Sequence, residues 1–231
     1  MTGAMHFESA LHLFSIMKKL PYTPLQILIH LGAWFPFVKL VFDYFTNNLS
    51  PNPIQDFEQR TGFAAITLLI LSLASTPLNT VFGWREPLKR RRALGLYAFF
   101  YATLHVTVYL ALDYGFDLDL LIEATLEKRY TLIGTLSFLL LIPLAITSFK
   151  WWMRKLGKNW KRLHKLVYLI APMAVFHFAW ARKGDIFTLQ GDVLLPFIYG
   201  LIALLLLGMR FPPLRKALVS RRTRGLPRAS K

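Results

Sequence analysis

The sequence predicts an all-α membrane protein: a bundle of six transmembrane helices with both termini on the cytoplasmic side. The chain of 231 residues is 55% hydrophobic, and its mean hydropathy is +0.41. Only 17% of its residues are charged, against about a quarter in ordinary soluble domains. These charged residues stand in short blocks between long apolar runs, which is the pattern of loops between membrane spans.

Six apolar stretches are long enough to cross a bilayer, which takes about 20 residues. The third and fourth contain no charged residue. Lys39 in the first and Lys165 in the fifth lie near an end of the span, where a lysine side chain can reach the interface. The predicted spans are residues 25–45, 62–80, 93–112, 130–149, 163–181 and 193–209.

The distribution of charge predicts the orientation. With the N-terminus inside, 22 of the 28 Lys and Arg residues lie on the cytoplasmic side, and ten of the 12 acidic residues lie outside. Basic residues accumulate on the cytoplasmic side of membrane proteins. We therefore expect a cytoplasmic tail or interfacial segment at 1–24, a membrane domain at 25–210 and a basic cytoplasmic tail at 211–231.

Composition and motifs exclude several classes of function. A net charge of +16 first suggests a nucleic-acid partner, but the basic residues are confined to loops between spans, so we expect none. The absence of Cys excludes disulfides, thiolate-bound iron–sulfur clusters and covalently attached c-type haem. No loop is long enough for a soluble domain, and no nucleotide-binding or H-E-x-x-H motif is present. The function must therefore reside in the bundle or at its faces.

Four histidines lie in predicted spans, where ionisable residues are rare and usually functional. His105 lies roughly 18 Å from the inner end of the third span, and His177 lies roughly 20 Å deeper than His164 on the fifth. His105 and His177 are therefore expected at a similar outer depth on different helices. His164 and His30 are expected near the inner end.

This spacing suits b-type haem, which two imidazoles from neighbouring helices can clamp. We expect His105 and His177 to hold an outer haem and His164 an inner one, with His30 as a candidate second ligand on grounds of depth alone. Each histidine also has a simpler explanation, a hydrogen bond between helices. On an ideal helix the last two histidines would point roughly 140° apart, unless Pro172 bends the helix. Small residues before His105 could admit a cofactor or only pack helices; they are Gly95, Ala98 and Ala102.

Three charged segments are candidate contact surfaces. Arg91 and Arg92 could bind haem propionates, a flavin phosphate or a quinone head group, since Arg binds such anions bidentately. Membrane topology and anionic lipid would also explain these arginines. Residues 150–165, with three Trp, are a candidate docking face for a soluble electron donor, and the acidic loop 113–127 for a partner outside.

Several segments together resemble the MsrQ (YedZ) family of haem-binding membrane subunits, within the ferric-reductase-like transmembrane superfamily. The resemblance covers nearly the whole chain. It rests on HLGAWFPF from His30, QRTG through Gly62, STPL from Ser75, RRALGLYAFFYATLHVTVY through His105, KRLHKLVYL with His164 and APMAVFHFAW with His177.

The resemblance implies an electron-transfer subunit in the bacterial inner membrane with one or two b-type haems and an association with FMN. Electrons would come from quinol or a cytoplasmic flavin reductase and go to MsrP, a periplasmic molybdenum-cofactor enzyme that reduces methionine sulfoxide in proteins. His105, His164 and His177 match the family's haem-ligand histidines. The wider superfamily has a second histidine on the third span, where this chain has Arg91, so the ligands of the inner haem remain open.

Two other functions stay open. The chain could be a cofactor-free transporter or membrane scaffold whose buried histidines relay protons or pack, although the repeats or paired helix breaks of a transporter are not evident. A ferric reductase proper would normally carry a nucleotide-binding domain, which this sequence lacks. No residue has the pattern of a catalytic acid, base or nucleophile, so we expect the sulfoxide chemistry on the partner subunit.

Overall fold

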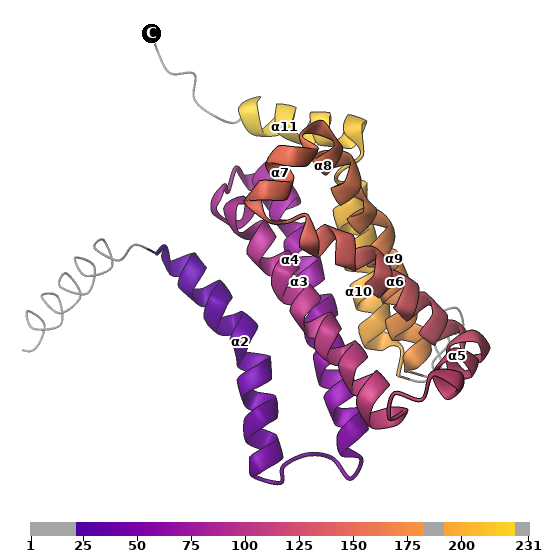
Figure 1. Cartoon of the computed structure of the whole chain (residues 1–231). Coiled ribbons are helices and arrows are strands. Elements are labelled where there is room, and N and C mark those ends of the chain that lie inside the picture. Colours follow the sequence, from indigo (N-terminus) through magenta and orange to yellow (C-terminus); the bar gives the residue numbers. More distant parts are fainter. Residues whose placement is uncertain (1–21, 183–191, 225–231) are drawn as a thin grey trace, which may run out of the picture.

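The computed structural model describes residues 22–182 and 192–224, and all of its regular elements are helices. Residues 1–21, 183–191 and 225–231 lie outside the described residues, and with them most of the predicted N-terminal tail and the end of the C-terminal one. The elements (Figure 1) are α2 Pro24–Phe45, α3 Pro53–Phe82, α4 Glu86–Val108 with a π-helical extension Tyr109–Asp113, α5 Leu118–Glu127, α6 Arg129–Ile146, α7 Lys150–Leu156, α8 Lys158–Leu163, a 3₁₀ turn His164–Leu166, α9 Val167–Ala181, α10 Leu194–Gly208 and α11 Pro212–Arg224.

The described residues contain five helices long and apolar enough to cross a membrane, and six if one bent pair counts as a span. The bent pair is α10 and α11, which meet at 78°. With 15 residues, α10 is about 22 Å long, shorter than a bilayer core of about 30 Å. The second span is longer than predicted, Pro53–Phe82 against 62–80, because the helix continues through Asp56 and Arg60, whose charges ended the apolar stretch.

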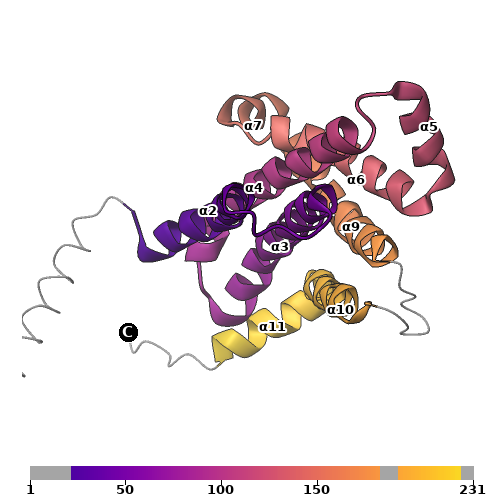
Figure 2. The same ribbon diagram turned by 90° about the horizontal axis from the view of Figure 1, so that it is seen from below.

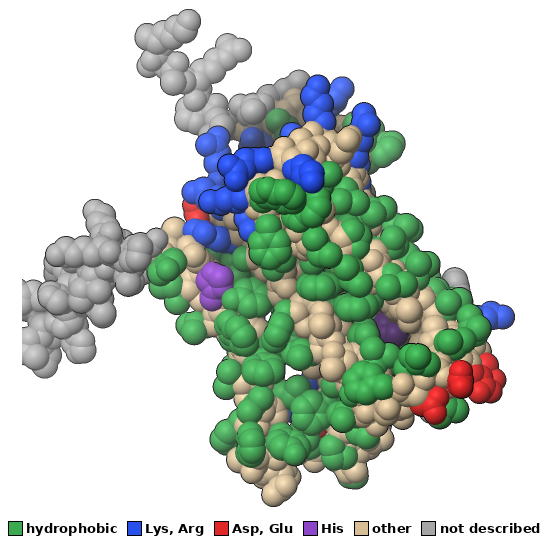
Figure 3. All heavy atoms as spheres, viewed as in Figure 1, with side chains coloured by type: hydrophobic (Ala, Val, Ile, Leu, Met, Phe, Trp, Pro, Cys, Tyr) green, Lys and Arg blue, Asp and Glu red, His purple; other side chains and the backbone are tan. Residues whose placement is uncertain are grey.

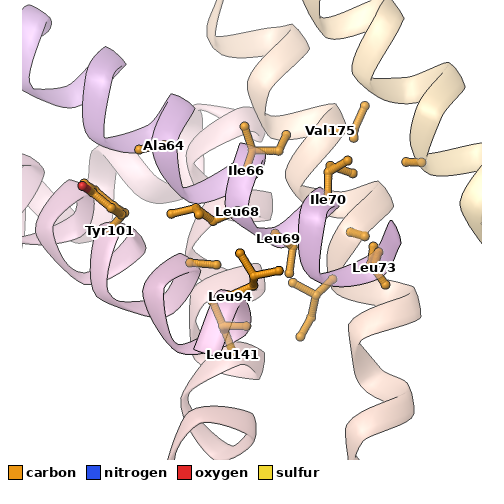
Figure 4. Packing of buried hydrophobic residues seen from close by; sticks show 14 of the residues in the cluster. Ala64, Ile66, Leu68, Leu69, Ile70, Leu73, Leu94, Tyr101, Leu141 and Val175 are labelled. Carbon is orange, nitrogen blue, oxygen red and sulfur yellow. The ribbon is translucent and has the colours of Figure 1, made fainter. Parts of the chain in front are cut away.

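Helix α3 is the centre of the bundle. Its membrane window is 56% buried, against 11% for α2, and it contacts α2, α4, α9, α10 and α11. The small residues before His105 pack α4 against this helix: Ala98 is 1% exposed, and a methyl group on Gly95 would lie 3.6 Å from Oγ of Ser72. The stripe thus serves helix packing. The hydrophobic core around α3 (Figure 4) includes Ala64, Ile66, Leu68, Leu69, Ile70, Leu73, Leu94, Tyr101, Leu141 and Val175.

The charged side chains gather at opposite ends of the bundle, with hydrophobic surface between them (Figure 3). Lys and Arg side chains cover the end formed by α7, α8, α11 and the start of α4, and acidic side chains gather near α5 (Figures 1 and 3). Thr23 lies 3.5 Å from Arg90 at the start of α4. Both ends of the described chain are therefore at the basic end. That this end is cytoplasmic stays a prediction.

A tyrosine from α4 bridges the turn of α2 that contains a proline. Pro36 removes one backbone donor from α2, which weakens the helix locally. The buried hydroxyl of Tyr101 donates to the carbonyl of Ala33 at 2.6 Å and accepts from the N–H of Phe37 at 3.0 Å. In a regular helix these two backbone groups would pair with each other. Tyr101 therefore bridges the weakened turn and ties α2 to the bundle.

The outer end of α2 is tied to α3 by charge. Asp43 is only 4% exposed, and a buried carboxylate needs charged partners. It accepts from Lys39 at 2.6 Å and from Arg60 of α3. Arg60 also pairs with Asp56 at 2.9 Å. Since α2 lies at the edge of the bundle (Figure 2), polar ties of this kind fix its position.

We expect Tyr101→Phe to lower the free energy of unfolding by about 1–3 kcal/mol, because two backbone groups of α2 lose their partner in an apolar environment. Thermal unfolding of the purified protein in one detergent measures the loss. Tyr22→Phe is the control, because that side chain is exposed. Equal stability of the two variants would contradict the bridging role of Tyr101.

Candidate functional site

Two histidines from distant parts of the sequence meet in the half of the bundle that is predicted to be the outer one. His105 lies on α4 and His177 on α9. Their ring centroids are 5.9 Å apart, and the ring planes make an angle of 78°. The structure thus brings together the two residues that were expected at matched depth.

Each ring is held by a backbone carbonyl of a neighbouring helix, which is α3 for His105 and α6 for His177. Nδ1 of His105 lies 2.9 Å from the carbonyl oxygen of Glu58 in α3, and Nδ1 of His177 lies 2.7 Å from that of Tyr130 in α6. A carbonyl oxygen can only accept, so each Nδ1 carries the proton. In the neutral ring, Nε2 then keeps its lone pair, as in histidines that bind metal.

A glycine lies against each ring. A methyl group added to Gly62 would lie 3.1 Å from Nδ1 of His105, and one added to Gly134 would lie 2.5 Å from Nδ1 of His177. Each glycine stands four residues after the accepting carbonyl, on the same helix face. The missing side chain therefore lets the imidazole approach the backbone closely enough to donate its hydrogen bond.

His164 occupies the opposite, basic end. It begins the 3₁₀ turn between α8 and α9, and its Nδ1 lies 3.1 Å from the carbonyl of Trp160. The Trp160 ring lies against the His164 ring, with centroids 4.1 Å apart and planes tilted by 31°. Nε2 of His164 is buried and has no hydrogen-bond partner among the described residues. The irregular backbone thus lies at His164 itself, while α9 continues through Pro172.

The other predicted site residues are His30, Arg91 and Arg92, and they have fewer contacts that point to a bound cofactor. His30 lies on α2 with Nδ1 2.7 Å from the hydroxyl of Tyr97, a contact that joins α2 to α4. Arg91 and Arg92 are exposed. Arg91 donates to Thr76 at 3.4 Å and is within electrostatic range of His164. Binding roles for these three residues stay predictions.

A protein-only metal site is not evident, because residues 22–182 and 192–224 contain no group of three or more His, Asp or Glu placed to hold a metal ion. A pair of imidazoles alone is too small a ligand set for a structural zinc ion. It suits a planar metal cofactor that brings its other ligands with it.

Comparison with known proteins identifies the family. A family model described as "Ferric reductase like transmembrane component" matches residues 61–175. Three relatives are named protein-methionine-sulfoxide reductase heme-binding subunit MsrQ. The relative from Xanthomonas axonopodis pv. citri is 40% identical over 191 residues, which cover 80% of this chain and 84% of the relative. The relative from Xanthomonas campestris pv. campestris strain 8004 is 44% identical over 175 residues, 76% of each chain. The relative from Herminiimonas arsenicoxydans is 36% identical over 189 residues, 81% of this chain and 84% of the relative.

This chain belongs to the MsrQ family. It is a multi-pass membrane protein, as its apolar helices and the matching transmembrane family indicate. The matched range contains His105 and His164 and ends two residues before His177.

Three features of this MsrQ-family chain were not predicted from its sequence. They are the carbonyls that accept from the histidines, the glycines beside the rings and a repeated spacing that relates the two sets. His105 and His177 are each 47 residues after their accepting residue. The same spacing of 72 residues relates Gly62 to Gly134 and His105 to His177. It also relates Lys89-Arg90 to Lys161-Arg162, Leu94 to Leu166 and Ala102 to Ala174. A comparison of the sequence with itself would have shown this spacing.

Arg210 was missed as well. It lies after α10, where it donates to the hydroxyl of Tyr168 at 2.8 Å and to the carbonyl of Leu73 at 2.5 Å. That carbonyl is free because Pro77, four residues later, has no N–H. No local sequence signal connects positions so far apart.

We expect Gly134→Ala to lower the melting temperature in detergent more than Gly62→Ala. The added methyl group would stand 2.5 Å from the His177 ring, which cannot move without losing its hydrogen bond, against 3.1 Å at His105. Gly32→Ala is the control, because no atom lies within 4 Å of the added methyl group and Ala is the better helix former. A melting temperature of Gly134→Ala at or above that of the parent would contradict the close approach.

Proposed function

We propose that this chain is the haem-binding membrane subunit of a protein-methionine-sulfoxide reductase system, and that it carries electrons across the bacterial inner membrane to a periplasmic MsrP enzyme. The strongest support is the pair of imidazoles from His105 and His177, 5.9 Å apart, each with Nδ1 bound to a carbonyl, which leaves the lone pair on Nε2. The names of the relatives support the same cofactor and the same system.

The residues of this pair fit a b-type haem. Neutral imidazole nitrogens are suitable axial ligands, and a bound haem supplies one-electron redox chemistry. The carbonyls of Glu58 and Tyr130 fix the direction of each ring. Gly62 and Gly134 leave room for the rings against the backbone. The apolar core of the bundle excludes water from the surroundings.

We propose His164 as a ligand of a second, inner haem, because its Nε2 is buried and has no hydrogen bond of good geometry within the described residues, although the backbone of Leu144 lies within interaction range of the ring. Arg91 lies within electrostatic range of both His164 and Arg210. Neither arginine forms an ion pair within the part of the chain that the structure describes. This positive charge suits a propionate, the phosphate of FMN or a quinone head group. The chain would then bind one or two haems, with His30 as a remaining candidate ligand.

The charge distribution supports a direction of electron flow. The basic end, with the tryptophans of α7 and α8, suits anionic lipid and a donor on the cytoplasmic side, either quinol or a flavin reductase. The acidic end at α5 suits docking of the periplasmic partner. Electrons would enter near His164 and leave near His105 and His177.

The haem proposal is tested by absorption spectra of the protein purified from haem-replete cells. We expect a reduced α-band of b-type haem, and the loss of one haem per chain in His105→Ala and in His177→Ala, because each variant removes an axial ligand. Pyridine haemochrome analysis counts the haems. His12→Ala in the N-terminal tail is the control, and His30→Ala and His164→Ala test the inner ligands. A parent protein without haem would refute the proposal and favour the cofactor-free transporter or scaffold.

We also expect the purified chain alone to reduce no methionine sulfoxide, because no residue of the sequence has the pattern of a catalytic acid, base or nucleophile. Each sulfoxide takes up two electrons and two protons and releases water, so electrons must arrive in two single transfers. The assay supplies reductant and measures methionine formed with and without MsrP, using His177→Ala as the control without outer haem. Sulfoxide reduction by the chain alone would contradict the proposal that the sulfoxide chemistry takes place on the partner subunit.

A further inference from the structure

Two hydroxyl groups at the outer end of the bundle are buried without a hydrogen-bond partner among the described residues. They are Oη of Tyr109, the first residue of the π-helix after α4, and Oγ1 of Thr131 in the first turn of α6. Thr131 is only 6% exposed. Buried polar atoms are nearly always paired, and an unpaired one in a folded protein points to a bound group.

Local geometry explains why Thr131 lacks a partner. Hydroxyls inside helices often donate to the carbonyl four residues earlier, as Ser137 does to Ile133 at 2.7 Å in the same helix. Thr131 is the third residue of α6, so its own helix has no carbonyl at that position. The hydroxyls of Tyr114, Thr131 and Thr125 lie close enough to that of Tyr109 to interact with it, but none of these contacts has the geometry of a hydrogen bond. Both O–H groups are therefore free to donate to a third group.

Both residues are close in sequence to the groups that form the histidine pair. Tyr109 follows His105 by four residues, one turn further along the helix, where α4 continues into the π-helix. Thr131 follows Tyr130, whose carbonyl holds His177. A positive charge stands nearby, because Lys128 donates to the hydroxyl of Tyr114 at 3.3 Å, and the Tyr114 ring lies 4.9 Å from that of Tyr109. Two free donors and one cation thus gather at the outer side of the pair.

We propose that Tyr109 and Thr131 bind the carboxylate groups of the haem held by His105 and His177. This inference rests on the proposed function. Ionised carboxylates only accept hydrogen bonds, so they match two O–H donors that form no hydrogen bond within the described residues. Lys128 adds charge of the opposite sign. Donors and charge beside a haem also influence its reduction potential, so these residues would tune the outer haem as well as orient it.

The test uses the haem-loaded full chain with Tyr109→Phe, Thr131→Val and the double variant. Reduction adds an electron to the haem, and donors at the propionates offset negative charge. We therefore expect a lower midpoint potential of the outer haem in each variant and the largest shift in the double variant. The carboxylate bands of the propionates should shift in the redox-difference infrared spectrum. Thr131→Ser, which keeps the hydroxyl, should restore the parent values.

Two matched variants control for the loss of a hydroxyl inside the membrane. Tyr199→Phe removes a hydroxyl that already pairs with Thr67 at 2.7 Å, and Thr103→Val removes one that donates to the carbonyl of Phe99 at 2.9 Å. Parent-like potentials and infrared bands in Tyr109→Phe and Thr131→Val would overturn this inference and leave the proposed function intact. A parent protein without haem would instead overturn the proposed function itself.

Discussion

The functional end of this bundle depends on one repeated hydrogen bond, from a histidine side chain to a backbone carbonyl one turn before a glycine. A buried imidazole N–H must be satisfied, and in each case the acceptor comes from the partner helix at the same separation of 47 residues. This hydrogen bond fixes the tautomer and the orientation of the imidazole ring. It also holds the two helices at a short distance from each other. Gly62 and Gly134 are part of the same constraint, because a side chain there would push the ring away from its acceptor. The pairs α3–α4 and α6–α9 are therefore held by the same interactions that leave Nε2 free for a cofactor.

The rest of the bundle shows how a membrane protein accommodates prolines. Within lipid, a carbonyl freed by proline has no water to pair with, so another side chain must take the place of the lost donor. Tyr101 bridges the turn at Pro36, and Arg210 pairs with the carbonyl that Pro77 frees in α3. Tyr101 comes from α4, and Arg210 comes from the turn between α10 and α11. The breaks in single helices thus become ties between helices, and the edge helix α2 in particular depends on such ties.

Hydropathy predicted six spans, of which the described residues contain five, or six if the bent pair α10 and α11 counts as one, and depth along the spans was sufficient to pair His105 with His177. Both predictions rest on properties that a sequence carries locally, the apolar length of a segment and the rise of a helix. The partners of the histidines could not be predicted in this way, because a carbonyl carries no residue signature. The same holds for Arg210, whose acceptor lies 137 residues away. Because His164 and His177 are 13 residues apart, a bend at Pro172 was expected to change the angle between their side chains. The structure instead places a 3₁₀ turn at His164 and leaves α9 continuous.

The 72-residue repeat also shows how the two ends of the bundle differ. At the outer end the related positions are both histidine. At the inner end the same spacing relates Arg92 to His164, and Arg91 is its neighbour. The inner end therefore combines one imidazole with guanidinium groups, whereas the outer end has two neutral imidazoles. A cluster of cations attracts anionic ligands and partners, so the inner end suits a donor that carries phosphate, such as a flavin nucleotide. The acidic surface at α5 would repel the same molecule. The same spacing thus relates histidine to histidine at one end of the bundle and arginine to histidine at the other.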